Sequence, residues 1–462
     1  MSELLEQKES NLSIISYNMA DLILQTCEMT FGTFFFIFWE TEVKLNVWIV
    51  VLAYTIYAVW NAINDPLIGY YVDRPKKFWG QYGKRFPWIM ISAFPAILLV
   101  VAIFTSPDVD PVKGEWILFI WILIFLCLYE LFFTFFSLNH AALFPDKFRL
   151  DPDRRKVGAT GRALILVGTA FGSILPPLFI TYGDPQSYAT MAWIIAGISI
   201  ILFFTTIPGH IESKTMKERY IREQDERESF SFFKALKIVL SSKNFIVVIL
   251  IFLMDGIIGL SLIASIHYVT KYVLLEEAGI SIFLMVGFLL GALGSLFFWL
   301  LLAQKLKNNR KMFIIGTFLN TILLLPFMFV EDIIGFTIAA LLLGIGGGAL
   351  RAGQDPILAD TIDEAIVKTG QRMEGAFMGV RTFFLRFGIV IQGLIFAITH
   401  TLTGFDPGAD VQTSLAIFGI RVHTALIPMI LTLIALVIFI LVYKLTPEIT
   451  KEIKEKIKEL NL

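Results

Sequence analysis

The chain has 462 residues, of which 56% are hydrophobic and only 17% are charged, whereas about a quarter of the residues in a soluble domain carry charge. This composition excludes an ordinary soluble protein, and the net charge of −1 gives no reason to expect nucleic-acid binding. The apolar residues form blocks of roughly 20 residues, the length that a helix needs to cross a bilayer.

These blocks predict an all-α membrane protein with about twelve transmembrane helices in two six-helix halves of the major facilitator type. The predicted spans are roughly 13–38, 46–71, 87–105, 115–138, 159–182, 189–207, 244–271, 279–303, 312–330, 333–352, 376–400 and 421–444. We predict four regions in chain order: an N-terminal six-helix half (1–209), a charged linker (210–243), a C-terminal six-helix half (244–445) and an amphipathic tail (446–462).

Basic residues alternate between the two sides of the predicted bundle. The loops after the second, fourth, sixth and eighth spans are rich in Lys and Arg, and the opposite loops have almost none. By the positive-inside rule, this pattern predicts a multi-pass protein of the cell membrane with both termini in the cytoplasm. The polar start, 1–12, lacks the order of charge and apolar residues that marks a cleavable signal peptide.

The first predicted span carries a polar stripe. Asp21, Gln25 and Glu28 follow each other at helical spacing and therefore share one face. Charge inside a bilayer costs at least a few kcal/mol per residue, so such a stripe is expected to point into the bundle. It indicates ligands for a substrate or a cation; a packed seam of interhelical hydrogen bonds is the alternative.

The second predicted span contains a polar face followed by a proline. Asn61, Asn64 and Asp65 lie on this face, and Pro66 removes a backbone hydrogen bond from the preceding turn. One carboxylate, two amide oxygens and a loosened backbone suit a proton or a hard monovalent cation. The alternative is a kink that the side-chain amides stabilise.

Further ionisable residues interrupt later spans. Glu130 and Thr134 share a face of the fourth span, Arg162 enters the fifth, and Arg386 enters the eleventh. We expect Arg386 to neutralise buried carboxylates around a cavity, although a purely structural pair remains open. His140 alone is a weak signal, since a lone histidine is more often packed than a ligand.

Enzyme motifs are missing from the sequence. There is no phosphate-binding loop of the Gly-x-x-x-x-Gly-Lys-Ser/Thr type, no His-Glu-x-x-His and no paired Cys-x-x-Cys. Cys27 and Cys127 lie in apolar runs and are predicted to stay reduced. We therefore expect no enzyme and no cofactor or metal beyond a coupling ion, and the twelve-span plan favours a monomeric carrier over a channel.

Two segments carry a resemblance to a known family. They are Trp60–Trp88, WNAINDPLIGYYVDRPKKFWGQYGKRFPW, and Leu358–Gly375, LADTIDEAIVKTGQRMEG. The first resembles the Trp-Asp-x-x-x-Asp-Pro-x-x-Gly segment and the Gly-Lys/Arg-x-x-Pro-Trp/Tyr loop of the glycoside–pentoside–hexuronide:cation symporters, which include the melibiose permease. The second resembles that family's Ala-Asp-x-x-Asp loop with its Thr-Gly-x-Arg-x-Glu-Gly end.

The resemblance implies roles for individual positions. Of the two cation-binding aspartates that the melibiose permease branch has in its second helix, this chain keeps Asp65 and has Asn61 in place of the other. The first-helix sugar ligand falls on Gln25, with Glu28 one turn further on. Arg162 matches a fifth-helix arginine, and Arg386 stands where the family has an eleventh-helix lysine.

Together these observations predict a secondary active transporter that couples H⁺ or Na⁺ to the uptake of a sugar, glycoside or sugar acid by alternating access. A carrier of lysolipid or another non-sugar, or a non-transporting membrane sensor, is the alternative. The predicted cation ligands are Asp65, Asn61, Asn64 and Glu28, and the predicted substrate ligands are Gln25, Glu28, Glu130, Arg162 and Arg386. The predicted cytoplasmic gate, for which simple topological anchoring is the alternative, comprises Asp73, Arg74, Lys84, Arg85, Asp360, Asp363, Arg372 and Glu374.

Overall fold

The computed structural model describes residues 9–222, 240–370 and 374–459, and the chain forms two compact units, Met1–Glu228 and Ser229–Leu462. The described residues form helices joined by loops and turns. Twelve of the helices in these ranges are long and apolar enough to cross a membrane, judged by length and composition. The predicted all-α fold with about twelve membrane-length helices is therefore confirmed.

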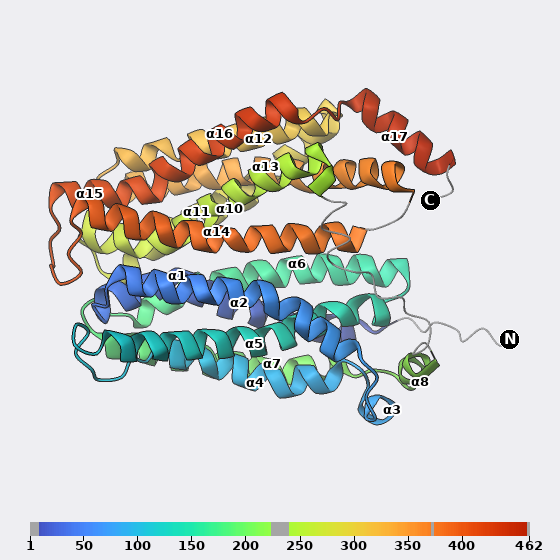
Figure 1. Cartoon of the computed structure of the whole chain (residues 1–462), viewed down its shortest axis with the longest axis horizontal. Coiled ribbons are helices and arrows are strands. Elements are labelled where there is room, and N and C mark those ends of the chain that lie inside the picture. Colours follow the sequence, from blue (N-terminus) through green and yellow to red (C-terminus); the bar gives the residue numbers. More distant parts are fainter. Residues whose placement is uncertain (1–8, 223–239, 371–373, 460–462) are drawn as a thin grey trace. The chain divides into compact units, whose positions relative to one another are not determined.

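The described residues of the first unit include six membrane-length helices and two short α-helices (Figure 1). Side-chain oxygens of Ser10, Asn46 and Asp184 cap the first turns of the first, second and sixth long helices. The helices are α1 (Asn11–Phe36, continued by a π-helical segment Ile37–Glu42), α2 (Val47–Asp73), α3 (Trp79–Tyr82), α4 (Phe86–Ile103), α5 (Glu115–Lys147), α6 (Asp151–Ile174), α7 (Pro185–His210) and α8 (Lys214–Arg222).

The part of the second unit that the structure describes again has six membrane-length segments, followed by a polar tail helix. Its hydrophobic core includes fully buried aromatic residues of three helices, Phe245, Phe313 and Phe439. The helices are α10 (Lys243–Tyr268), α11 (Ser281–Leu306), α12 (Asn309–Ile322), α13 (Ile333–Thr369), α14 (Glu374–Thr403), α15 (Ser414–Arg421), α16 (Ile427–Val442) and α17 (Pro447–Glu459).

Two helices extend well beyond their predicted ends. The span predicted over 115–138 continues as α5 to Lys147, and the span predicted over 333–352 continues as α13 to Thr369. The expectation of a loop around Asp360 and Asp363 is therefore wrong, because both residues lie within α13. An apolar run marks only the part of a helix that lies within the hydrocarbon of the bilayer, and these extensions carry charged residues such as Lys147 and Asp360. Pro66 lies inside α2, which continues for two more turns.

Small residues allow close helix contacts within each unit, as is common in membrane proteins. In the first unit, a Cβ on Gly168 of α6 would lie 2.6 Å from the Leu22 carbonyl oxygen of α1. In the second unit, a Cβ on Gly344 of α13 would lie 2.1 Å from the Phe288 carbonyl oxygen of α11. The backbones of these helix pairs therefore touch where a larger residue would hold them apart.

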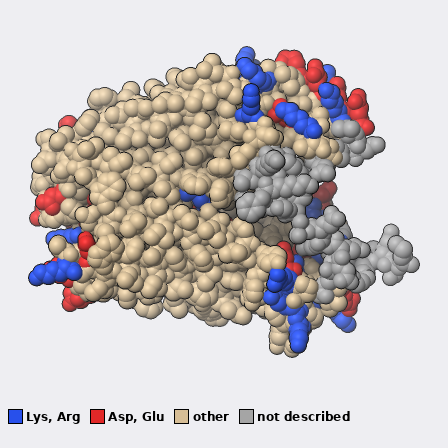
Figure 2. All heavy atoms as spheres, in the orientation of Figure 1, with Lys and Arg blue, Asp and Glu red and all other residues tan. Residues whose placement is uncertain are grey.

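Charged side chains gather toward the ends of the helices, and the surface between them is largely uncharged (Figure 2). Many large apolar side chains of the membrane-length helices are exposed, such as Ile201, Phe297 and Leu441. Such a surface is unsuited to water and suits the hydrocarbon of a bilayer.

Candidate functional site

Two carboxylates of the first unit approach one hydroxyl group. Thr134 of α5 places its Oγ1 3.0 Å from Asp65 Oδ1 of α2 and 3.2 Å from Glu130 Oε1, one turn earlier on α5. Glu130 is only 2% exposed, and Asp65 is half-buried. We name Asp65 and Glu130 the carboxylate pair. A threonine hydroxyl has one proton to donate, so it satisfies one of the two carboxylates at a time.

Polar residues of α2 surround this pair. Tyr57 donates its hydroxyl to Glu130 Oε2 at 2.9 Å, and Asn64 Nδ2 lies 3.3 Å from the Glu130 carbonyl oxygen. Asn61 is fully buried, and among the described residues no hydrogen-bond partner reaches either of its side-chain polar atoms. A buried amide without such a partner is costly, and a ligand at this point would satisfy it.

The other predicted ligands occupy different environments. On α1, Gln25 is half-buried and Glu28 is exposed. Glu28 and Glu130 both lie within electrostatic reach of the buried Tyr54, so Glu28 belongs to the neighbourhood of the carboxylate pair. Arg162 of α6 is exposed, and Arg386 of α14, in the second unit, is half-buried.

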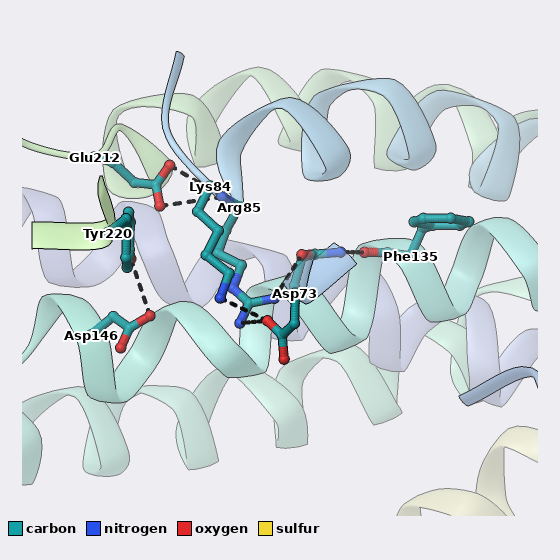
Figure 3. Close-up of polar contacts among 8 residues, drawn as sticks. Asp73, Lys84, Arg85, Phe135, Asp146, Glu212 and Tyr220 are labelled. Carbon is teal, nitrogen blue, oxygen red and sulfur yellow. Dashed lines mark hydrogen bonds and ion pairs between the residues drawn. The ribbon is translucent and has the colours of Figure 1, made fainter. Parts of the chain in front are cut away.

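A second group of charges lies where α2 ends and α4 begins (Figure 3). Lys84 Nζ and Arg85 Nη2 point at the same atom, Asp73 Oδ1, at 2.7 and 2.8 Å. Arg85 Nη1 also lies 3.4 Å from Asn139 Oδ1 of α5. Lys84 and Arg85 are both buried despite their charge. Together with Glu212, these four residues form what we call the loop cluster.

Glu212, just after α7, binds the first turn of α4. Its carboxylate accepts hydrogen bonds from the backbone N–H groups of Arg85, at 3.2 Å, and of Phe86, at 3.4 Å. These N–H groups have no partner within the helix, and the positive end of the helix dipole favours an anion there. Burial of the side chain raises the pKa of Glu212 above its ordinary value, against the hydrogen bonds that lower it.

The short helix α8 is attached to this region by polar contacts with residues earlier in the chain. Tyr220 donates its hydroxyl to Asp146 Oδ2 at 3.1 Å, as Figure 3 shows. Lys217 Nζ donates to the Gln81 carbonyl oxygen at 2.8 Å. The segment after α7 is thereby held against the loop between α2 and α4.

The remaining predicted gate residues have contacts of their own. Arg74 donates to the Tyr70 hydroxyl and stacks on its ring. In the second unit, Asp360 accepts from Asn309 Nδ2 at 2.7 Å and lies 3.6 Å from Lys454 Nζ. Asp363 lies half-buried on α13. Arg372 is outside the described residues, and of Glu374 only its place at the start of α14 is described.

The sequence predictions did not include Tyr57 and Glu212, which contribute to these sites. Tyr57 precedes the recognised polar face of α2 by one turn, and its spacing to Asn61 and Asn64 would have placed it there. Glu212 binds backbone atoms, which no side-chain pattern reveals.

Comparison with known families shows to which family this chain belongs. A family model described as "MFS/sugar transport protein" matches residues 16–447. The chain belongs to this family. Its members are transporters of the major facilitator superfamily and not enzymes, which confirms the predicted class and the predicted family resemblance.

Several relatives are called symporters. The chain is 26% identical over 440 residues to "Uncharacterized symporter YnaJ" of Bacillus subtilis, with 93% of this chain and 91% of the relative covered. It is 24% identical to "Sodium-dependent lysophosphatidylcholine symporter 1" of Xenopus tropicalis, with 81% and 76% covered. It is also 24% identical to "Putative glycoside/cation symporter YagG" of Escherichia coli, with 81% and 79% covered.

A solved structure shows the same fold. A bacterial homologue of the human lysosomal transporter Spinster, in an inward-facing and unoccupied conformation, gives a TM-score of 0.67 at 11% sequence identity. The match covers 97% of this chain and 99% of that one. The family and the fold together establish a multi-pass membrane transporter of the major facilitator type.

Proposed function

We propose that this protein is a symporter of the cell membrane that couples the uptake of a sugar, glycoside or sugar acid to H⁺ or Na⁺ by alternating access. The observation that carries the proposal is the carboxylate pair, Asp65 and Glu130, on either side of the Thr134 hydroxyl. The symporters among the relatives and the sugar transport family support it.

The carboxylate pair is suited to holding one small cation. Two ionised carboxylates on one hydroxyl repel each other, and that hydroxyl has one proton for both. A proton on either carboxyl group removes the repulsion, because the protonated group donates to Thr134. A sodium ion achieves the same balance, with the amide oxygens of Asn61 and Asn64 as further ligands.

We favour the proton as the coupling ion. Asp65 is the one second-helix carboxylate that remains at the family's cation positions, and Asn61 supplies an oxygen without charge. A monovalent metal ion needs the charge of both members of the carboxylate pair and a shell of further oxygens, whereas a proton needs only one carboxylate of the pair. Glu28 is proposed as an additional cation ligand on α1.

The substrate proposal rests on the hydrogen-bonding side chains that are available. Four of them, Gln25, Glu28, Glu130 and Arg162, belong to the first unit. A sugar presents hydroxyl groups that such side chains bind as donors and acceptors. Arg386 of the second unit is proposed to bind an acidic group of the substrate or to balance a carboxylate.

We also propose that the loop cluster forms part of the cytoplasmic gate, with both chain termini on that side of the membrane. Its two buried cations share one aspartate, Asp73, so a rearrangement at the end of α2 changes the partners of both Lys84 and Arg85. Gate contacts that also involve Arg74, Asp360, Asp363, Arg372 and Glu374 remain part of this proposal.

A second candidate substrate has a specific observation in its favour. The similarity to lysophosphatidylcholine symporters makes a lysolipid the main alternative to a sugar. Purified protein in liposomes should be offered a labelled glycoside, a labelled hexuronate and labelled lysophosphatidylcholine, each with a pH gradient, a Na⁺ gradient or neither.

The proposal predicts accumulation of a sugar substrate with one of the two gradients and none without. Accumulation of the lysolipid alone would replace the sugar with that substrate class. Binding of a ligand without any uptake would contradict transport and favour the sensor alternative. Protein-free liposomes are the control for passive entry.

A further inference from the structure

We propose that Asp21, His140 and His210 form a buried proton-binding site that holds one proton in the arrangement observed. The three residues come from α1, α5 and α7 of the first unit. This site is separate from the carboxylate pair and goes beyond the proposed function, since it stands whether or not Asp65 carries the coupling ion.

The geometry fixes the number of protons. His210 Nδ1 lies 2.7 Å from the Thr206 carbonyl oxygen, which only accepts, so this nitrogen carries a hydrogen. His210 Nε2 lies 2.9 Å from His140 Nδ1, and one hydrogen lies between them. His140 Nε2 lies 3.0 Å from Asp21 Oδ1, and a third hydrogen lies there.

These three contacts need three hydrogens, which is more than two neutral histidines and one carboxylate supply. Two neutral imidazole rings carry one N–H each, and an ionised carboxylate carries none. The arrangement therefore holds one proton more than two neutral histidines beside a carboxylate. Whether this proton sits on an imidazole or on Asp21, the total charge of the three residues is zero. Without it, two lone pairs would face each other across a hydrogen-bond distance.

The surroundings hold the two rings in place. The Tyr17 ring stacks on His140 with centroids 4.3 Å apart, and its hydroxyl donates to the His140 carbonyl oxygen at 2.7 Å. The His140 side chain is 5% exposed and His210 is fully buried, whereas the Asp21 side chain is 22% exposed. Asp21 is therefore the member of the site from which the proton exchanges with water.

The charged neighbours on each packed helix are few. On α5, Lys147 donates its Nζ to the Gly209 carbonyl oxygen at 2.6 Å, next to His210, which disfavours a second positive charge there. On α6, Gly161 faces Asp21, and the adjacent Arg162 is exposed. The sequence of α4 has no titratable residue, and on α1 Tyr17 is the neighbour. A charged neighbour changes the energy of the site but puts no hydrogen between His140 Nε2 and Asp21 Oδ1, which lie 3.0 Å apart.

Loss of the proton would break the link between two helices. Without the extra proton, neutral His140 has one N–H for two contacts, so either its bond to Asp21, which joins α5 to α1, or its bond to His210, which joins α5 to α7, is lost. The site thus ties the contact between these helices to protonation.

The test is to measure the net charge of the parent and of two variants at pH 7, by proton titration or electrophoresis of the purified full-length proteins. In Asp21→Asn, the amide donates an N–H to neutral His140 and replaces the bound proton. The proposal predicts an unchanged net charge, because a neutral site stays neutral. Asp184→Asn is the matched control: this cap residue lies at the surface, and an asparagine caps equally well, so its net charge should rise by one.

A rise of one charge in Asp21→Asn would overturn the proposal, because it would show an ionised Asp21 beside neutral histidines. If that variant does not fold, His140→Gln decides. The proposal predicts that its charge falls by one, since the bound proton leaves with the imidazole. An unchanged charge in His140→Gln would overturn the proposal.

Discussion

Replacement of Glu212 by alanine tests the role of this side chain at the start of α4. The carboxylate accepts from the backbone N–H groups of Arg85 and Phe86, and Glu212 itself is only 2% exposed. A lost helix cap costs about 1 kcal/mol, and a buried donor left without an acceptor costs about 1–3 kcal/mol. These terms overlap, so we expect Glu212→Ala to lower the free energy of unfolding by about 2–3 kcal/mol.

The matched control is Glu212→Gln, which keeps an oxygen that accepts from the same N–H groups. We expect it to remain within about 1 kcal/mol of the parent, because it loses the charge but not the hydrogen bonds. Unfolding in mixed micelles, followed by circular dichroism, gives both values. Equal stability of Glu212→Ala and the parent would refute the capping role.

The parent protein and Glu212→Gln should also differ in how the free energy of unfolding depends on pH. Burial raises the pKa of Glu212 above its ordinary value of 4.5, so the folded protein keeps this proton to higher pH than the unfolded chain. The part of the free energy of unfolding that depends on this proton is therefore full below the ordinary value and is lost as the pH rises through the raised one, whereas the hydrogen bonds that the carboxylate accepts remain. Glu212→Gln should lack this decline; the same decline in both proteins would contradict the assignment.

Two further predictions concern the same region. Gly83, with φ of +96°, would place a Cβ 1.7 Å from Glu212 Oε2, so Gly83→Ala should cost at least about 1–3 kcal/mol in the same unfolding assay. Gly158→Ala, on α6 with open space around it, is the control and should stabilise by about 0.5–1 kcal/mol; equal effects would refute the strain argument. Thr215→Cys on α8 should react with an impermeant maleimide only in permeabilised cells, and labelling of intact cells would refute the cytoplasmic placement of this helix.

Local spacing revealed the polar face of α2 but not its partners. Asn61, Asn64 and Asp65 share a face by helical geometry alone, and this could be predicted from their positions. The contact of Asp65 with Thr134 joins residues 69 positions apart and depends on how α2 packs on α5. No periodicity in one helix contains that information.

The loop cluster illustrates the same limit. Asp73, Lys84 and Arg85 could be singled out as charges next to apolar spans, because isolated charges at such positions need partners. Glu212 joins them from 127 residues away and binds backbone N–H groups, which are the same in every sequence. The site of Asp21, His140 and His210 was hidden for a similar reason, since each histidine alone resembles a packed core residue.

The most direct test of cation coupling is uptake by the Asp65→Asn variant in liposomes. The amide keeps the shape of Asp65 and a contact with Thr134 but cannot bind a proton or supply a charge. Our account predicts that the variant fails to accumulate substrate with either a pH or a Na⁺ gradient and still exchanges labelled for unlabelled substrate. Asp184→Asn should accumulate like the parent. Full accumulation by Asp65→Asn would contradict the account.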